Sequence, residues 1–150
     1  MTNKIYFPPE NLQSDLCKYL FVYAATKLTS NKNLDQSFLS TYKSLMESPT
    51  KIIQTFPKDK NKKILEMRKK KVFNDDYFYQ TKQYDKETEL FCFLRHLRNI
   101  ISHGQLREDD THTKFVLEDL DYFNNRKLTA YGVISKGKID SIIKAFLQIK

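Results

Sequence analysis

Three polar residues in the second half of the chain, Arg98, Asn99 and His103, have types and spacing that suit chemistry. An arginine is always charged and binds phosphate oxygens through two parallel hydrogen bonds. A histidine titrates near neutral pH and can give or take a proton. An asparagine beside the arginine can orient the histidine or hold a phosphate oxygen. Such groups suit metal-free cleavage of RNA, in which the 2′-hydroxyl attacks the neighbouring phosphorus and needs a base, an acid and positive charge.

The same residues also suit a helix end without chemistry. Positive side chains stabilise the last turn of a helix because they face its negative end. In this interpretation Arg95, Arg98 and His103 complement the helix dipole, and Gly104 ends the helix. Residues five apart lie roughly 140° apart around an ideal helix, so Arg98 and His103 converge only through a partner surface or a distorted last turn. Spacing alone leaves both interpretations open.

We expect a helix from 85 to 103 to position these groups. Its apolar residues recur at spacings of three and four: Leu90, Phe91, Leu94, Leu97, Ile100 and Ile101. Asp85 is the expected N-cap, Glu87 and Glu89 place negative charge in the first turns, and Gly104 is a left-handed stop. Arg98 lies at the border of the polar face. That face carries Arg95, Asn99, Ser102 and His103.

The twelve residues from Phe93 to Gly104, FLRHLRNIISHG, resemble the signature helix of the HEPN superfamily. That family carries an arginine, usually a polar residue after it, and a histidine four to six intervening positions further on. Here four residues separate Arg98 from His103, and Asn99 is the polar residue. The form is similar to that of many small bacterial members.

Family members with the full motif are often metal-independent endoribonucleases that act as dimers. The resemblance therefore implies that His103 transfers a proton, Arg98 holds a phosphate and Asn99 orients these groups. Arg95 and Ser102 are neighbouring candidates that the motif itself does not support. The resemblance also implies RNA as substrate and a homodimer with the motif helices at its interface. We expect no cofactor and no metal ion.

The biological setting that the resemblance implies is a toxin or anti-phage defence role, with an antitoxin or regulatory protein as partner. Some HEPN toxins carry a tyrosine two residues after the histidine, where a partner nucleotidyltransferase modifies them. Gln105 stands there in this chain, which puts that control route in doubt. A non-catalytic HEPN module for nucleotide or RNA binding, or for scaffolding, is the alternative.

The rest of the chain predicts a mostly α fold, a helical bundle of four to five helices with a small β-hairpin before the C-terminal helix. Apolar spacing indicates helices over 12–28, 38–46 and 139–147, and a short one through Ile52, Ile53 and Phe56. The spacing of apolar residues over 72–84 does not decide between a helix and a strand.

The predicted β-hairpin spans residues 113–135. Two runs with β-branched and aromatic residues, 114–120 and 128–134, flank Asn124-Asn125-Arg126, which has turn composition. A length of 150 residues is near the usual domain size, so we expect a single domain over 1–150.

Positive charge gathers between Lys58 and Lys71, where eight basic residues outnumber two acidic ones in a chain of net charge +8. We expect a basic loop over 58–71. Such a cluster attracts phosphate backbones but reads little sequence. The candidate RNA-binding residues are Lys62, Lys63, Arg68, Lys69, Lys70 and Lys71. A solvated linker is the alternative.

No stretch reaches about 18 consecutive apolar residues, and the first nine residues lack the apolar core of a secretory signal. We therefore expect a cytoplasmic protein without membrane contact. Cys17 and Cys92 are expected as reduced, packed thiols rather than a disulfide. His96 is expected on the helix surface and His112 in a loop.

Overall fold

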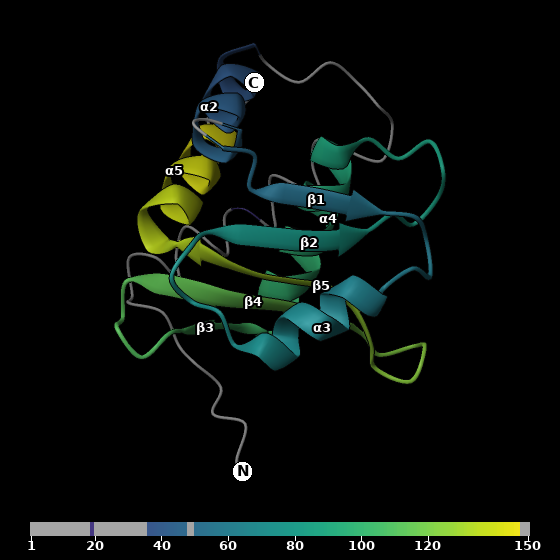
Figure 1. Ribbon diagram of the computed structural model, residues 1–150. Helices are drawn as coiled ribbons and strands as arrows, with labels where there is room; N and C mark the ends of the chain where they lie inside the picture. Colours follow the sequence, from purple (N-terminus) through teal and green to yellow (C-terminus); the bar gives the residue numbers. More distant parts are fainter. Residues whose placement is uncertain (1–18, 20–35, 48–49, 148–150) are drawn as a thin grey trace.

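The computed structural model describes Tyr19, residues 36–47 and residues 50–147 (Figure 1). In this part of the chain a five-stranded sheet lies between helices. The helices are α2 (Gln36–Met46), α3 (Lys62–Lys70), α4 (Glu89–Ser102) and α5 (Lys136–Leu147). The strands are β1 (Ile53–Phe56), β2 (Tyr77–Thr81), β3 (Leu106–Glu108), β4 (Lys114–Asp121) and β5 (Lys127–Ser135).

The predicted mostly helical bundle is wrong, because the described chain is a mixed α/β structure. Its strands follow the order β1-β2-β5-β4-β3 across one sheet. Strand β1 runs parallel to β2, whereas the other neighbouring strands pair antiparallel. None of the described helices is long and apolar enough to span a membrane.

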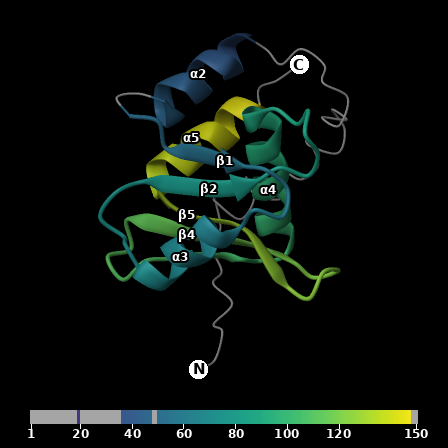
Figure 2. The same cartoon turned by 45° about the vertical axis from the view of Figure 1, so that its right-hand side comes forward.

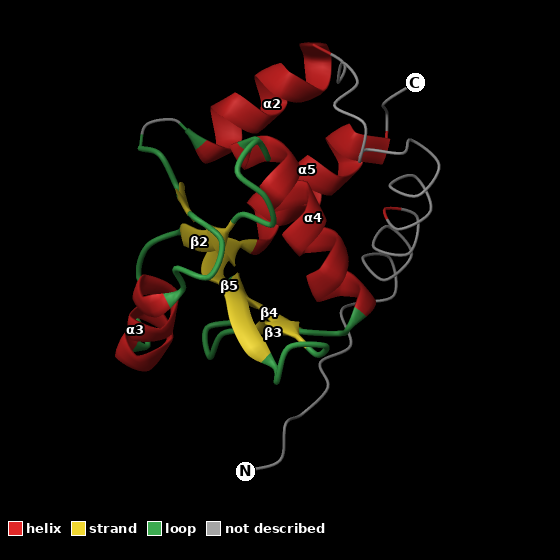
Figure 3. Cartoon of the chain, turned by 90° about the vertical axis from the view of Figure 1, so that its right-hand side faces the viewer, coloured by secondary structure: helices red, strands yellow, loops and turns green. Residues whose placement is uncertain are grey.

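Two hydrophobic cores lie on the two faces of the sheet. Helices α4 and α5 cover one face and α3 covers the other, as Figures 2 and 3 show, and α2 packs against α5 beyond the β1 edge. The larger core joins α2, α4 and α5 to sheet residues such as Phe78 and Phe115. The smaller core joins Ile64 of α3 to Tyr131 and Val133 of β5. The sheet therefore separates α4 from α3.

The short helix expected through Ile52, Ile53 and Phe56 is also wrong, because Ile53–Phe56 forms strand β1 beside β2. Strand β2 lies in the segment whose period is ambiguous. Four of its five residues are buried, since helices cover both faces of the sheet. A strand buried on both faces loses the alternation that reveals strands in a sequence.

The basic segment is not the loop that we expected, because residues 62–70 form helix α3. Lysine, arginine, leucine, methionine and glutamate all favour helices. One buried side chain, Ile64, docks this helix on the sheet, and Leu65 and Met67 pack beside it. The helix ends at Lys71, which is left-handed with φ of 52°.

The hairpin expected over 113–135 corresponds to β4 and β5, which pair antiparallel. It is not a small appendage, because β5 also pairs with β2 in the middle of the sheet. Gly132 is required there, since a Cβ atom would lie 2.5 Å from the Tyr77 carbonyl oxygen. The expected helices over 38–46 and 139–147 correspond to α2 and α5. The expected helix over 12–28, apart from Tyr19, and Cys17 lie outside the described residues.

Candidate functional site

Helix α4 carries the motif and has well-defined ends. It begins after Thr88, whose hydroxyl accepts a hydrogen bond from the Phe91 N–H at 3.3 Å, so the N-cap predicted at Asp85 is wrong. Gly104 has φ of 66° and follows the helix end at His103, as predicted. The N–H groups of Gly104 and Gln105 donate to the last turn at 3.2 and 2.9 Å. These paired bonds fix the backbone at His103.

A cavity of about 300 Å³ lies beside the C-terminal half of α4. The turn between β4 and β5 and the residues after β2 form its other walls. Arg98, Asn99 and His103 all line it, and so does Arg95, whereas Ser102 does not. The three motif residues therefore share one cavity within a single subunit, despite their separation around the helix.

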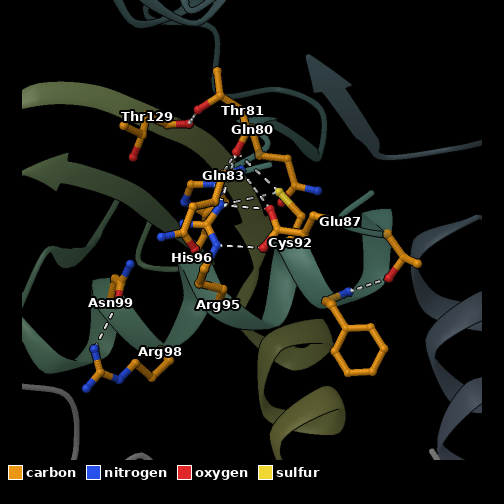
Figure 4. A network of polar contacts seen from close by, with 12 residues as sticks. Gln80, Thr81, Gln83, Glu87, Cys92, Arg95, His96, Arg98, Asn99 and Thr129 are labelled. Carbon is orange, nitrogen blue, oxygen red and sulfur yellow. Dashed lines mark hydrogen bonds and ion pairs between the residues drawn. The ribbon is translucent and has the colours of Figure 1, made fainter. Parts of the chain in front are cut away.

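A chain of hydrogen bonds fixes Asn99 between Arg98 and Asp119. The Arg98 Nη1 donates to Asn99 Oδ1 at 3.0 Å (Figure 4), and Asn99 Nδ2 donates to Asp119 Oδ2 at 3.3 Å. Because an ionised carboxylate only accepts hydrogen bonds, Asp119 sets which end of the Asn99 amide faces it. The amide oxygen then points to Arg98 and holds the guanidinium at the cavity.

His96 is fully buried, so its predicted place on the helix surface is wrong. Its Nδ1 lies 2.6 Å from Asp119 Oδ2, and its Nε2 lies 2.8 Å from the Thr81 carbonyl oxygen. The side of α4 that carries His96 packs on the sheet and leaves little room for solvent. Both ring nitrogens face oxygen atoms of the protein, so His96 forms an inner wall rather than a free proton carrier.

Arg95 is held by Glu87 in a nearly buried ion pair (Figure 4). Its Nε and Nη2 donate to the two carboxylate oxygens at 2.8 and 3.0 Å. Burial acts to raise the pKa of Glu87, but hydrogen bonds from Arg95 and from the Gln83 N–H outweigh it, and the pKa is lowered. The charge of Arg95 is therefore compensated within the protein, and this residue supports the wall behind Arg98.

His103 is exposed and contacts the turn between β4 and β5. Its ring meets the Tyr122 ring at a centroid distance of 5.0 Å and an interplanar angle of 78°. The Tyr122 hydroxyl accepts a hydrogen bond from Gln105 Nε2 at 2.7 Å. The Arg126 guanidinium lies 5.7 Å above the same ring. The His103 imidazole thus packs on Tyr122, which Gln105 and Arg126 contact in turn, and it lines the cavity.

The predicted RNA-binding residues do not line this cavity. Lys62, Lys63, Arg68, Lys69, Lys70 and Lys71 belong to α3 and its end, on the opposite face of the sheet from α4 (Figure 3). From the same segment Lys58 and Asp59 line the cavity, together with Lys82 and Lys127. Lys127 forms an ion pair with Asp59 at 2.6 Å. Among the described residues, basic side chains thus lie both on α3 and along the cavity.

Sequence reasoning missed the contributions of Asp119 and Tyr122. It also placed Glu87 in the first turns of the helix, whereas Glu87 precedes the N-cap Thr88 and pairs with Arg95. The alternation along β4 could have revealed Asp119, because it lies on the same face of the strand as Phe115 and Leu117, which face α4. A carboxylate at a position where the alternation predicts an apolar residue indicates a buried polar partner. Tyr122 had no such signal, since turns commonly expose polar aromatic residues.

Two other residues lie where the sequence predicted. Cys92 is buried and forms no disulfide. Burial and the nearby Glu87 charge raise the pKa of its thiol, which keeps it protonated. His112 lies in the loop between β3 and β4, where its exposed ring contacts Glu108 at 2.6 Å.

The fold and the Arg98-Asn99 and His103 pattern define a mixed α/β domain with a HEPN motif helix. The chain belongs to the HEPN pEK499 p136 family, whose model matches residues 4–149. This match confirms the resemblance based on the motif. No curated protein and no solved structure matches the chain.

Proposed function

We propose that this protein is a metal-independent endoribonuclease of HEPN type, which cleaves RNA by attack of the 2′-hydroxyl on the neighbouring phosphorus. The observation that carries the proposal is that Arg98, Asn99 and His103 line one cavity. HEPN domains are often ribonucleases, so family membership supports the same reaction class.

The proposed roles follow from the side chains. His103 takes the proton from the 2′-hydroxyl as its oxygen bonds to phosphorus, and the bond from phosphorus to the 5′-oxygen breaks. Arg98 binds the non-bridging oxygens and stabilises the negative charge that grows on them. Asn99 keeps the Arg98 guanidinium at the cavity through the 3.0 Å hydrogen bond. The products are a 2′,3′-cyclic phosphate and a 5′-hydroxyl.

The reaction also needs an acid that gives a proton to the leaving 5′-oxygen. Among the described histidines at the cavity, His96 is engaged on both ring nitrogens, so His103 is the group left for proton transfer. A second copy of His103 supplies the acid if two subunits join their motif helices. We therefore also propose a homodimer with α4 at its interface. The exposure of Arg98 and His103 fits this arrangement.

The basic residues of α3 act in this proposal as an electrostatic guide for RNA. A toxin or anti-phage defence role with an antitoxin or regulatory partner is the proposed setting, and it rests on family analogy alone. A non-catalytic RNA-binding module is the second candidate. The specific observation in its favour is that α3 lies across the sheet from the motif, so RNA could bind there without being cut.

The test is incubation of the purified chain with single-stranded and structured RNAs in the presence of EDTA. Fragments that end in 2′,3′-cyclic phosphate and 5′-hydroxyl support the nuclease. Salt-dependent RNA binding without fragments favours the binding module. A chain that neither binds nor cleaves RNA would contradict both candidates.

A further inference from the structure

The turn between β4 and β5 presents a fully exposed aromatic ring at the mouth of the cavity. The relative exposure of Phe123 is 102%, and Phe123 lines the cavity with Arg98 and His103. Apolar side chains of this size normally reach partial cover. Full exposure beside a site with phosphate-binding chemistry leaves the ring available to a ligand that can cover it.

Hydrogen bonds in the turn hold Phe123 in this position. Asp121 Oδ1 accepts from the Phe123 N–H at 3.1 Å, and the Asp121 carbonyl oxygen accepts from the Asn124 N–H at 3.1 Å. The Asn124 carbonyl oxygen accepts from the Lys127 N–H at 3.0 Å. These bonds fix the backbone of the turn, so a ligand that binds the ring has to order only the Phe123 side chain.

The neighbouring tyrosine is engaged, which leaves Phe123 as the free ring of the turn. Tyr122 contacts His103, Gln105 and Arg126. Among the described residues, no aromatic ring and no cation stacks on Phe123. Both faces of its ring are therefore open to a planar partner.

Basic side chains outnumber acidic ones along the cavity that Phe123 lines, five to three, which favours an anionic partner. Lys58, Lys82 and Arg98 line the same cavity and form no ion pair with a described carboxylate. Exposed aromatic rings beside uncompensated cations are the combination by which proteins hold single-stranded nucleic acid, with bases on the rings and phosphates on the cations. A duplex does not offer this contact, because its bases already stack on one another.

We propose that Phe123 forms a base-binding position, at which its ring stacks on an unpaired base next to the phosphate held at Arg98. This inference rests on the proposed function and adds that position to it. The base lies on the ring, the backbone crosses the cations of the cavity, and His103 reaches the 2′-hydroxyl of the adjoining nucleotide.

The test measures binding apart from cleavage. The probe is a short fluorescent 2′-O-methyl oligoribonucleotide, which cannot be cut because its 2′-oxygen is blocked, used single-stranded or annealed to its complement. Phe123→Ala is expected to raise the Kd for the single strand roughly 5- to 150-fold. The Kd for the duplex changes less than about twofold, and Phe123→Trp retains tight binding.

Tyr84→Ala is the matched control, because Tyr84 is 45% exposed and does not line the cavity. Equal affinities of Phe123→Ala and Tyr84→Ala would overturn the stacking proposal, and so would equal losses on single strand and duplex. Loss of a dimer in sedimentation of Phe123→Ala would overturn it as well, since the ring would then be a subunit contact.

Cleavage of unmodified RNA separates this proposal from the proposed function. Phe123-dependent binding of single strands without any cleavage by the native chain keeps the base subsite and contradicts the nuclease. Cleavage that is unchanged in Phe123→Ala, with unchanged binding, keeps the nuclease and contradicts the subsite. No binding of the single strand by the native chain contradicts both.

Discussion

Replacement of Asp119 by alanine tests how the fold positions the motif. Asp119 is 3% exposed; its Oδ2 lies 2.6 Å from His96 Nδ1 and accepts a hydrogen bond from Asn99 Nδ2. The substitution leaves the buried His96 Nδ1 without its partner and releases the amide of Asn99. We expect a less stable protein, and in the molecules that still fold, an Arg98 that is no longer held at the cavity.

The expected loss of stability follows from the two contacts. The bond to His96, 2.6 Å long and made to a carboxylate, contributes about 1.5 to 3 kcal/mol. The bond from Asn99 is longer, at 3.3 Å, and contributes about 0.5 to 1 kcal/mol. The unfolding free energy should therefore fall by about 2 to 4 kcal/mol. In a chain of this size that lowers Tm by roughly 4 to 16 °C.

The assay is urea unfolding followed by circular dichroism, with cleavage rates measured at a temperature where the variant stays folded. Asp110→Ala is the matched control, because Asp110 is exposed and its loss should change stability by at most about 0.5 kcal/mol. A kcat that falls in Asp119→Ala while the protein is folded supports the positioning role. An unfolding free energy of Asp119→Ala equal to that of the native chain would refute the reasoning, because the two buried contacts would then contribute nothing to stability.

Three further predictions concern the motif arginine, the basic helix and acid stability. Arg98→Ala should abolish cleavage with little change in Tm because the residue is exposed, whereas Arg98→Lys should keep part of the activity. Replacement of Lys69–Lys71 by glutamine should weaken RNA binding and reduce the slope of log Kd against log salt by up to about 2, and an unchanged slope would remove α3 from the binding surface. Since the folded-state pKa of Glu87 lies below its ordinary 4.5, the stability from its ion pair is present well above pH 4.5 and is lost as pH falls through the lowered value. Between pH 7 and pH 3, the unfolding free energy of Glu87→Gln should fall less steeply than that of the native chain. An equally steep fall in both proteins would contradict this prediction.

The motif helix and the hairpin were predictable because their signals are local. Apolar spacing and Gly104 mark α4, although the helix begins after Thr88 rather than at Asp85. β-branched and aromatic runs around a turn mark β4 and β5. Such patterns depend only on neighbours in the sequence, so a single chain reveals them.

The parallel pair was not predictable from such local signals. Strand β1, helix α3 and strand β2 form one unit, in which the helix lies in the connection between two parallel strands. Reading residues 52–56 as a helix and residues 58–71 as a loop are two errors about this same unit. The short β1 and the highly charged α3 each have weak patterns of their own. They are stabilised by the sheet that they build together.

The site was predictable in its motif residues but not in their support. Arg98, Asn99 and His103 are readable because they are close in sequence. Asp119 reaches Asn99 across 20 positions, and Tyr122 reaches His103 from the next strand connection. Contacts of this kind depend on strand register, which the sequence alone did not determine for this sheet.

The most direct test of the central claim compares the native chain with His103→Ala in RNA cleavage with EDTA, at matched concentrations of folded protein. His112→Ala is the control, because His112 is exposed and lies outside the cavity. We predict that the native chain and His112→Ala release 2′,3′-cyclic phosphate ends, and that His103→Ala releases none while its Tm is unchanged. Cleavage by His103→Ala at the native rate would contradict the account.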